Sequence, residues 1–234
     1  MFGPGRWAHR PSATIGVVST SFADITLAGF LTRLASAEPT PGGGSASAVA
    51  GSMAASLLAM VASLSAGRPK YAPYAATLER AAAVGTDMRD RLLALADDDA
   101  RAYEGFGSAM KMPRETPDEI AARKAAIQAA SRAATEVPMQ VVRACRTVVA
   151  ELESLAGRSN LNASSDLVVG ALLIDAAARG AAANVFINLP SVGDAEFEDQ
   201  ALREVTGALS LIEDLAAEVR LVVGSGALRD PEDA

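Results

Sequence analysis

Residues 45–65 read SASAVAGSMAASLLAMVASLS, a stretch that contains no charged side chain. Its larger apolar residues recur at intervals of three and four, which is the spacing of one helical face. The positions between them are Ala, Ser and Gly, so neighbouring elements can pack on every side. The stretch is poor in large apolar residues, and its tendency to enter lipid is weak. We therefore expect a buried central helix and no membrane span.

The same helical periodicity extends over most of the chain. Aromatic residues make up only 4% of the sequence, and Val, Ile and Thr seldom alternate with polar residues, so strand signals are close to absent. Proline and glycine divide the periodic pattern into segments of helical length. Helices are predicted at about 27–34, 45–65, 76–111, 119–155, 164–188 and 196–223.

Particular residues predict how these helices begin, bend and end. Pro39 ends the first helix, because a residue before proline resists the α region. Pro138 lies inside the fourth helix, where it is expected to produce a kink. Ser164 or Ser165 is expected to cap the fifth helix. That helix is expected to be interrupted near Gly180.

Six helices joined by short loops predict an all-α, up-and-down antiparallel helical bundle of about six helices. Residues 21–224 would form its single domain, with a loose tail at 1–20 and a frayed tail at 225–234. Two long helices and one apolar helix with small residues all round offer more surface for burial than a small bundle provides. We therefore expect the protein to be a homodimer.

Composition excludes several classes of function. The net charge of −7 argues against nucleic acid as a partner, because phosphate binding draws on clustered Lys and Arg. The single cysteine, Cys145, cannot form an internal disulfide, which fits a reducing, cytoplasmic compartment. The single histidine, His9, lies in the tail, so histidine triads and histidine or thiolate metal sites are not expected. Catalysis would rest on Asp, Lys, Tyr, Ser, Asn and backbone groups, without a metal.

The segment PTPGGGS at residues 39–45 is the strongest local feature. Its prolines stiffen the approach, its glycines allow a close approach of the backbone, and the free N–H groups at the helix start favour an anionic ligand. A flexible hinge or a close helix contact would explain the glycines equally well. The candidate ligand-binding positions here are Thr40, Pro41, Gly42, Gly43, Gly44 and Ser45.

Asp99 lies on the apolar face of the helix predicted at 76–111. Carboxylates are seldom buried without a partner, so an inward Asp is either paired with a buried base or held for chemistry with a shifted pKa. We favour the second reading, since the sequence identifies no buried Lys or Arg partner. Asp97 and Asp98 are expected to face water. The face that includes Asp99 consists of Leu92, Leu95, Asp99, Tyr103 and Phe106, with Met110 beyond it.

Further polar residues stand out on or near apolar elements. Asn184 and Asn188 are four residues apart, so their amides share one helical face and need hydrogen bonds there. They would serve a polar pocket, a C-terminal cap or an interhelical amide pair. Asp166 stands at a helix start, where interaction with the helix dipole is a sufficient explanation.

Six stretches of this chain, in this order and spacing, resemble the formiminotetrahydrofolate cyclodeaminase/methenyltetrahydrofolate cyclohydrolase family, over roughly residues 24–223. The resemblance implies an all-α homodimer that binds tetrahydrofolate derivatives without a metal, nucleotide or other cofactor. The stretches are PTPGGGSASAVAG (39–51), GRPKY (67–71), ADDDARAYEGF (96–106), ATEVPMQVVRAC (134–145), SNLNASSDLVV (159–169) and ANVFINL (183–189).

The resemblance implies hydrolysis of 5,10-methenyltetrahydrofolate to 10-formyltetrahydrofolate. Lys70 and Tyr71 after Gly67 look more like the free-standing cyclohydrolases than like the bifunctional cyclodeaminases. The first alternative is the ammonia-releasing cyclodeaminase reaction on formiminotetrahydrofolate. The second is a non-catalytic folate-binding or scaffold homologue.

Roles for single residues follow from the resemblance. Asp99 would stabilise the cationic one-carbon unit or accept a proton, and Lys70 with Tyr71 would handle protons. Asp166 is a second candidate acid or an anchor for the pterin. By their own position in the chain, Arg68, Lys70 and Tyr71 could equally form a solvated turn. The substrate-binding positions would be Thr40, Pro41, Gly42, Gly43, Gly44, Ser45, Arg68, Asn162, Asn184 and Asn188.

Overall fold

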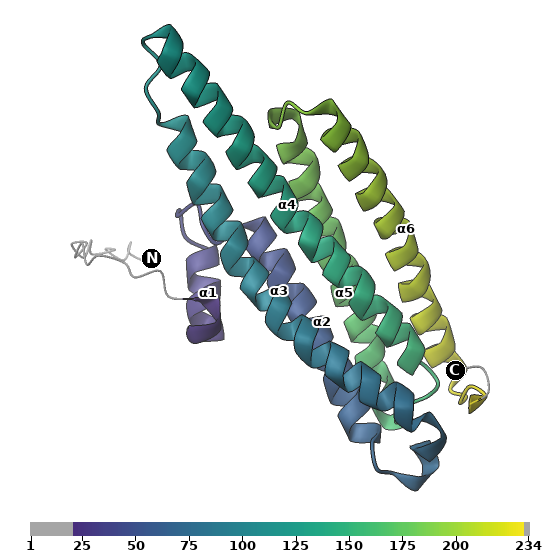
Figure 1. Ribbon diagram of the computed structural model, residues 1–234. Helices are drawn as coiled ribbons and strands as arrows, with labels where there is room; N and C mark the ends of the chain where they lie inside the picture. The colour runs from purple at the N-terminus through teal and green to yellow at the C-terminus, as the bar shows by residue number, and fades with distance from the viewer. Residues whose placement is uncertain (1–20, 232–234) are drawn as a thin grey trace, which may run out of the picture.

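The computed structural model describes residues 21–231, and within that range every regular element is a helix (Figure 1). This confirms the predicted all-α antiparallel bundle. Four short 3-10 helices, η1 (Phe22–Asp24), η2 (Pro69–Tyr74), η3 (Leu161–Ala163) and η4 (Leu189–Ser191), precede or connect the longer elements. The α-helices are α1 (Leu27–Leu34), α2 (Gly43–Ser65), α3 (Ala75–Met110), α4 (Pro117–Leu155), α5 (Ser164–Asn188) and α6 (Ala195–Ser225).

Helix α2 packs against α3, α4 and α5, which confirms its central place in the bundle. Helix α6 covers α4 and α5, while η1, which precedes the short α1, packs on α3 (Figure 1). By length and composition, Gly43–Ser65 and Leu161–Ser191 are long and apolar enough to cross a membrane. The core helices of soluble bundles have the same properties, and 44% of the most apolar window of each segment is buried here.

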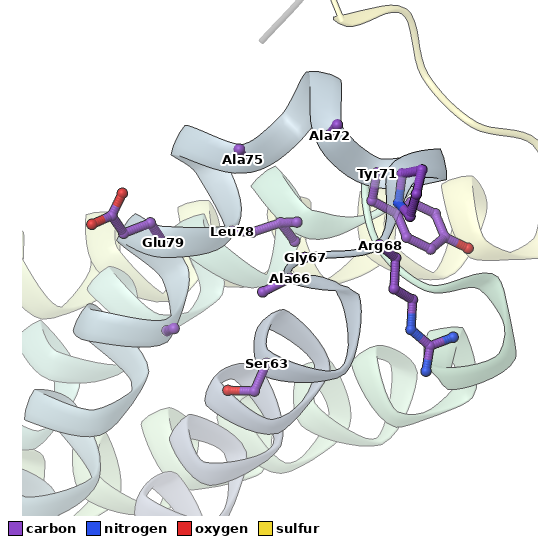
Figure 2. A pocket seen from close by; sticks show the side chains of 11 residues that line it. Ser63, Ala66, Gly67, Arg68, Tyr71, Ala72, Ala75, Leu78 and Glu79 are labelled. Atoms are coloured by element: carbon purple, nitrogen blue, oxygen red, sulfur yellow. The ribbon is translucent and has the colours of Figure 1, made fainter.

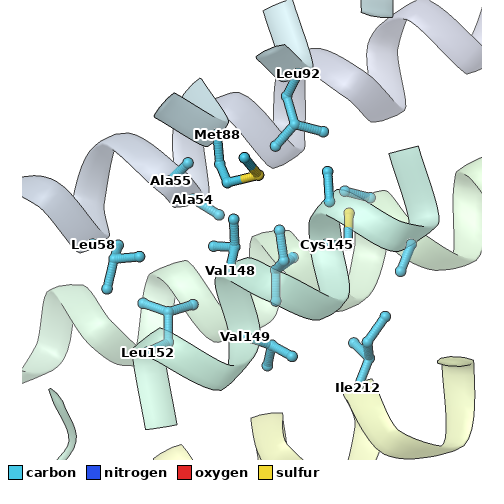
Figure 3. Packing of buried hydrophobic residues seen from close by; sticks show 14 of the residues in the cluster. Ala54, Ala55, Leu58, Met88, Leu92, Cys145, Val148, Val149, Leu152 and Ile212 are labelled. Atoms are coloured by element: carbon cyan, nitrogen blue, oxygen red, sulfur yellow. The ribbon is translucent and has the colours of Figure 1, made fainter. Parts of the chain in front are cut away.

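The buried core runs between α2, α3, α4, α5 and α6, and Figure 3 shows a part of it. Leu58, Leu92, Leu152 and Ile212 are fully enclosed there. Cys145 is enclosed with them, and burial raises the pKa of its thiol to about 12. The thiol therefore stays neutral and behaves as a small apolar side chain.

The helix starts differ in how they are capped. Thr116 and Glu119 form a reciprocal capping box at the start of α4, where Pro117 occupies the first turn. The expectation that Ser164 or Ser165 caps α5 is wrong. Instead, η3 runs directly into α5, and the Ser164 hydroxyl donates backward to the Leu161 carbonyl at 2.8 Å.

The two expected irregularities inside helices have different outcomes. Helix α4 continues without a break through Pro138. The kink expected there stays a prediction. The expected interruption near Gly180 is wrong, because α5 is continuous. A Cβ atom at position 180 would lie 2.3 Å from the Ser47 hydroxyl of α2, so this glycine serves a close contact between helices.

Several residues expected on buried faces are exposed. Tyr103 is 52% exposed and Met110 46%, because the end of α3 that carries them projects with α4 beyond α2 (Figure 1). In α1 only Phe30 is buried, whereas Leu27 and Leu31 are exposed. Helical periodicity identified the faces of these helices, but not how far their neighbours extend.

The expectation that Asp97 faces water is wrong. Its carboxylate accepts hydrogen bonds from the Ser21 hydroxyl at 2.6 Å and from the Phe22 backbone N–H at 2.9 Å. Asp97 therefore fixes η1 to α3. Asp98 is exposed and pairs with Arg101. The tail expected at 1–20 lies outside the described residues.

The chain after α6 is anchored rather than frayed at Arg229. The backbone N–H of Arg229 donates to the Gly157 carbonyl at 2.8 Å. Its guanidinium pairs with Glu153 at 2.5 Å and with Glu218 at 2.9 Å. The last residues of the expected tail, 232–234, lie outside the described range.

Gly85 tests the close packing of α3 on α2. A Cβ atom at this position would lie 2.8 Å from both the Ala55 carbonyl oxygen and the Ala59 nitrogen. We expect Gly85→Ala to lower the free energy of unfolding by about 1–3 kcal/mol, because the helix backbones must separate. Urea unfolding followed by circular dichroism would measure this change.

Gly105→Ala provides a control in the same helix, because nothing lies within 4 Å of its added Cβ. Alanine should stabilise α3 there by about 0.5–1 kcal/mol through helix propensity. Equal effects of the two substitutions would contradict the proposed close contact.

Candidate active site

The Asp99 carboxylate meets the start of α2. Its Oδ2 accepts a hydrogen bond of 2.9 Å from the Ser45 hydroxyl, which also lies 3.0 Å from the Ala96 carbonyl. The Ser45 backbone N–H contributes a second interaction with the carboxylate. Because Ser45 is fully buried, it positions Asp99 and does not face a cavity.

Gly44 is required by this contact. A Cβ atom there would lie 2.1 Å from Asp99 Oδ1, so any larger residue would displace the carboxylate. Gly42, at the N-cap position of α2, has no side chain to cap the helix. An anionic ligand was one expectation for this glycine-rich helix start, but the group that lies there is the carboxylate of Asp99. It occupies the position of an N-terminal capping group. Among the explanations considered for these glycines, the close contact between helices is confirmed.

Burial raises the pKa of the Asp99 carboxyl above its ordinary value, and the hydrogen bonds from Ser45 partly oppose this rise. Within the part of the chain that the structure describes, no Lys or Arg forms an ion pair with Asp99. The buried base considered as an alternative is therefore not found there. Asp99 is a half-buried carboxyl without a cationic partner among the described residues. It is therefore available to interact with a cationic ligand.

Asp99 borders a cavity of about 290 Å³, here called the Asp99 cavity. The segment before α2 closes one side through Thr40 and Gly42, whereas Pro41 is buried behind them and Gly43 lies beside Asn184. The apolar part of the lining consists of residues for which the sequence predicts no role in a site. That part consists of Ala102, Tyr103, Phe106, Ala134 and Ile187.

A signal for some of these residues is present in the sequence. Tyr103 and Phe106 follow Asp99 at helical spacing, so they share its face of α3. The helical pattern predicts that this face belongs to the core. Its continuation beyond the core is visible only once the neighbouring helices are placed.

Asn184 and Asn188 both line the Asp99 cavity, as expected from their shared face. The Asn184 amide donates to the Gly180 carbonyl at 2.8 Å, within its own helix. The Asn188 amide donates at 2.8 Å to the carbonyl of Ala134 on α4. Pro138 has no N–H, so that carbonyl lacks its usual helical donor, and Asn188 replaces it.

The other predicted site residues lie at the opposite end of α2. Arg68, Lys70 and Tyr71 follow its last turn, and Asn162 and Asp166 lie near them at the start of α5. Helix α2 has 23 residues, so the two groups are roughly 30 Å apart along it. Within one chain, Lys70 and Tyr71 therefore do not reach Asp99.

The segment around Tyr71 is a 3-10 helix rather than a solvated turn. Tyr71 is buried, and its hydroxyl accepts a hydrogen bond from the Leu161 N–H at 3.2 Å. The exposed Lys70 lies with its ammonium 5.6 Å from the centre of the Tyr71 ring. Beside them is a mainly apolar cavity of about 390 Å³, bordered by Arg68, Tyr71 and Glu79 (Figure 2).

The remaining two candidates of this group are less constrained. Asn162 is exposed, and Asp166 is half-buried in the first turn of α5, where the helix dipole explains it. Among residues 21–231 there is no group of three His, Cys, Asp or Glu side chains placed to hold a metal ion.

The fold and the site define a class: an antiparallel helical bundle with an unpaired carboxyl held at a glycine-rich helix start. The family model of formiminotransferase-cyclodeaminase matches residues 26–207. The chain therefore belongs to this family, which confirms the resemblance seen in its motifs.

Relatives and a solved structure agree with this membership. The chain is 39% identical over 185 residues to a methenyltetrahydrofolate cyclohydrolase of Methylorubrum extorquens, covering 79% of this chain and 89% of that protein. It is 34% identical over 183 residues to the formimidoyltransferase-cyclodeaminase of Gallus gallus, covering 78% of this chain but only 34% of that protein. The crystal structure of formiminotetrahydrofolate cyclodeaminase from Thermotoga maritima superposes with a TM-score of 0.79 at 30% identity, covering 87% and 98% of the two chains.

The raised pKa of the Asp99 carboxyl has a consequence for stability. The folded state opposes ionisation, so Asp99 lowers stability as pH rises above the ordinary carboxyl pKa. We expect Asp99→Asn to raise the melting temperature at pH 7, and this gain to shrink towards pH 4, because the cost of ionising the buried carboxyl falls as the pH approaches the ordinary carboxyl pKa. Thermal unfolding at both pH values would measure it.

Asp98→Asn is the matched control, because it removes the same charge from an exposed neighbour that is paired with Arg101. A gain for Asp99→Asn that is the same at pH 4 and pH 7 would show that ionisation of this carboxyl is not opposed by folding.

Proposed function

We propose that this chain hydrolyses 5,10-methenyltetrahydrofolate to 10-formyltetrahydrofolate. The observation that carries the proposal is the half-buried Asp99 carboxyl, which has no cationic partner in the described chain and borders a cavity of about 290 Å³. The substrate carries a delocalised positive charge on the one-carbon unit that bridges N5 and N10. A carboxylate in a poorly solvated site interacts strongly with such a cation.

In this reaction, water adds to the methenyl carbon and loses a proton, and a tetrahedral carbon forms. The bond from that carbon to N5 then breaks as the hydroxyl on the carbon loses its proton and becomes the formyl oxygen. N5 takes up a proton, and the formyl group stays on N10. One proton is released overall. Asp99 would stabilise the cation before attack or accept the proton of the water, and its raised pKa suits the second role.

The main alternative is the cyclodeaminase reaction, in which N10 attacks a formimino carbon and ammonia leaves. It also passes through a tetrahedral carbon beside a positive charge, so the same carboxylate would serve it. The identity to the cyclohydrolase of Methylorubrum extorquens over most of both chains favours the hydrolytic reaction. We further propose that the reaction uses no metal or other cofactor and takes place in the cytoplasm.

Absorbance measurements distinguish the two reactions from each other and from a protein that only binds folate. Purified protein should accelerate the loss of methenyltetrahydrofolate absorbance above its spontaneous rate. Asp99→Asn should slow this by roughly 10²–10³-fold, the range for loss of one preorganised electrostatic group. Asp98→Asn should retain the parent rate. Formation of methenyltetrahydrofolate and ammonia from formiminotetrahydrofolate would instead support the cyclodeaminase, and no turnover in either assay would refute catalysis.

We also propose that the protein is a homodimer formed through α2 and α5. These helices pack on each other and on α4, so their outer sides share the face that points away from α4. Met53, Met60, Leu172 and Val169 are 50%, 38%, 53% and 46% exposed on them. Since α2 carries no charged residue, this face suits burial against a second copy.

A two-fold axis near the middle of α2 would place the partner helix antiparallel to it. The start of one α2, with Asp99, would then meet the end of the other, with Lys70 and Tyr71. Two residue groups that are roughly 30 Å apart in one chain would thus complete one site. This arrangement would restore the proton-handling role proposed for Lys70 beside Asp99.

Mixing two inactive variants tests the shared site. Asp99→Asn and Lys70→Ala should each be inactive alone. Co-refolded in equal amounts, they should regain about a quarter of the parent activity, because half of the dimers are mixed and each has one intact site. If the variants stay inactive after mixing, while sedimentation shows mixed dimers, the two groups do not form one site.

A further inference from the structure

The chain that follows α6 reaches the end of the bundle that carries η2 (Figure 1). Gly226 ends α6 in the left-handed region, with a φ of 67°, and Leu228 then packs against the core. The Tyr74 hydroxyl, at the end of η2, donates a hydrogen bond of 2.5 Å to the Arg229 carbonyl. We call residues 226–230 the C-terminal strap, because they connect η2 with the rest of the bundle.

Arg229 is itself held by three parts of the structure. Its N–H donates to the Gly157 carbonyl at 2.8 Å, in the loop after α4. Its guanidinium pairs with Glu153 of α4 and with Glu218 of α6, and only 21% of its side chain is exposed. The carbonyl that Tyr74 contacts therefore cannot move unless these contacts break.

The sequence of η2, PKYAPY, depends on such outside contacts. Pro69 and Pro73 have no N–H, and hydrogen bonds in 3-10 helices have poorer geometry than those of an α-helix. Tyr71 and Tyr74 are three residues apart, so they share one side of η2, and they are only 5% and 4% exposed. The Tyr71 hydroxyl accepts the Leu161 N–H at 3.2 Å. One tyrosine hydroxyl in each half of η2 thus fixes this segment.

Lys70 is part of the segment that is fixed in this way. Its ammonium lies 5.6 Å from the centre of the Tyr71 ring, so its direction depends on the orientation of η2. We propose that Arg229 and Tyr74 are positioning residues for Lys70; this inference rests on the proposed function, in which Lys70 completes a site with Asp99 of a second copy. Neither residue lines the Asp99 cavity, and the strap follows the residues that the family model matches. They act by holding η2.

The kinetic test begins with Tyr74→Phe, which removes one hydroxyl and keeps the buried ring. It should lower kcat for methenyltetrahydrofolate hydrolysis about tenfold and leave KM unchanged, because a displaced proton-handling group slows the reaction without weakening binding. Arg229→Gln should act in the same direction. Arg220→Gln, at an exposed position of α6, should keep the parent kcat.

These assays would be run well below each melting temperature, so that a merely structural role leaves kcat at the parent value. A parent kcat in Tyr74→Phe, or a rise in KM alone, would overturn the positioning role.

The double variant Tyr74→Phe, Arg229→Gln tests whether the two residues act through one contact. If they do, its kcat should equal that of the less active single variant. Independent effects would instead multiply, to a loss of roughly 10²-fold for two tenfold losses, and this result would overturn the proposed route through Tyr74.

Hydrogen exchange provides a readout that does not depend on turnover. The amides of residues 68–75 should exchange about tenfold faster in Tyr74→Phe and in Arg229→Gln, and at the parent rate in Arg220→Gln. Faster exchange in a protein whose parent shows no turnover would refute the proposed function and leave the contact between strap and η2 standing. Faster exchange with a parent kcat would refute the positioning role and leave the hydrolytic function standing. Unchanged exchange in both variants would overturn the strap itself.

Discussion

The contact between the Asp99 carboxylate and the backbone of Gly44 connects the fold of this protein with its chemistry. The carboxylate takes the position of a cap at the start of α2, and the absence of a side chain at Gly44 makes that approach possible. Burial in this position raises the pKa of the carboxyl. The same contact therefore orders the start of the central helix and produces a group suited to a cationic substrate.

Close approach between helices recurs through the bundle and explains its composition. Gly85 lies against the backbone of α2, Gly180 against Ser47, and Gly170 against Leu152. Small residues at these points let the long helices pack closely. They also mean that α2 and α5 carry few large side chains. The outer face shared by these two helices remains apolar and uncharged on α2, which is the physical argument for a second copy.

Polar groups at the wall of the Asp99 cavity have structural as well as chemical roles. Pro138 removes one hydrogen bond from α4, and Asn188 supplies the missing donor to Ala134 from α5. This links the two helices at the point where the cavity lies between them. The amides that line the cavity are therefore held in place by bonds to backbone carbonyls, as a preorganised site requires.

The sequence by itself determined the helical class, the approximate helix limits and the candidates Asp99 and Gly42–Ser45, because helical period, glycine and proline act through the local chain. It also identified Asn184 and Asn188 as sharing one face. Only the tertiary structure decided that Lys70 and Tyr71 lie far from Asp99 in one chain, that Tyr103 is exposed, and that Asp97 binds η1. These facts depend on where neighbouring helices start and stop, and a periodic pattern along one helix contains no information about that.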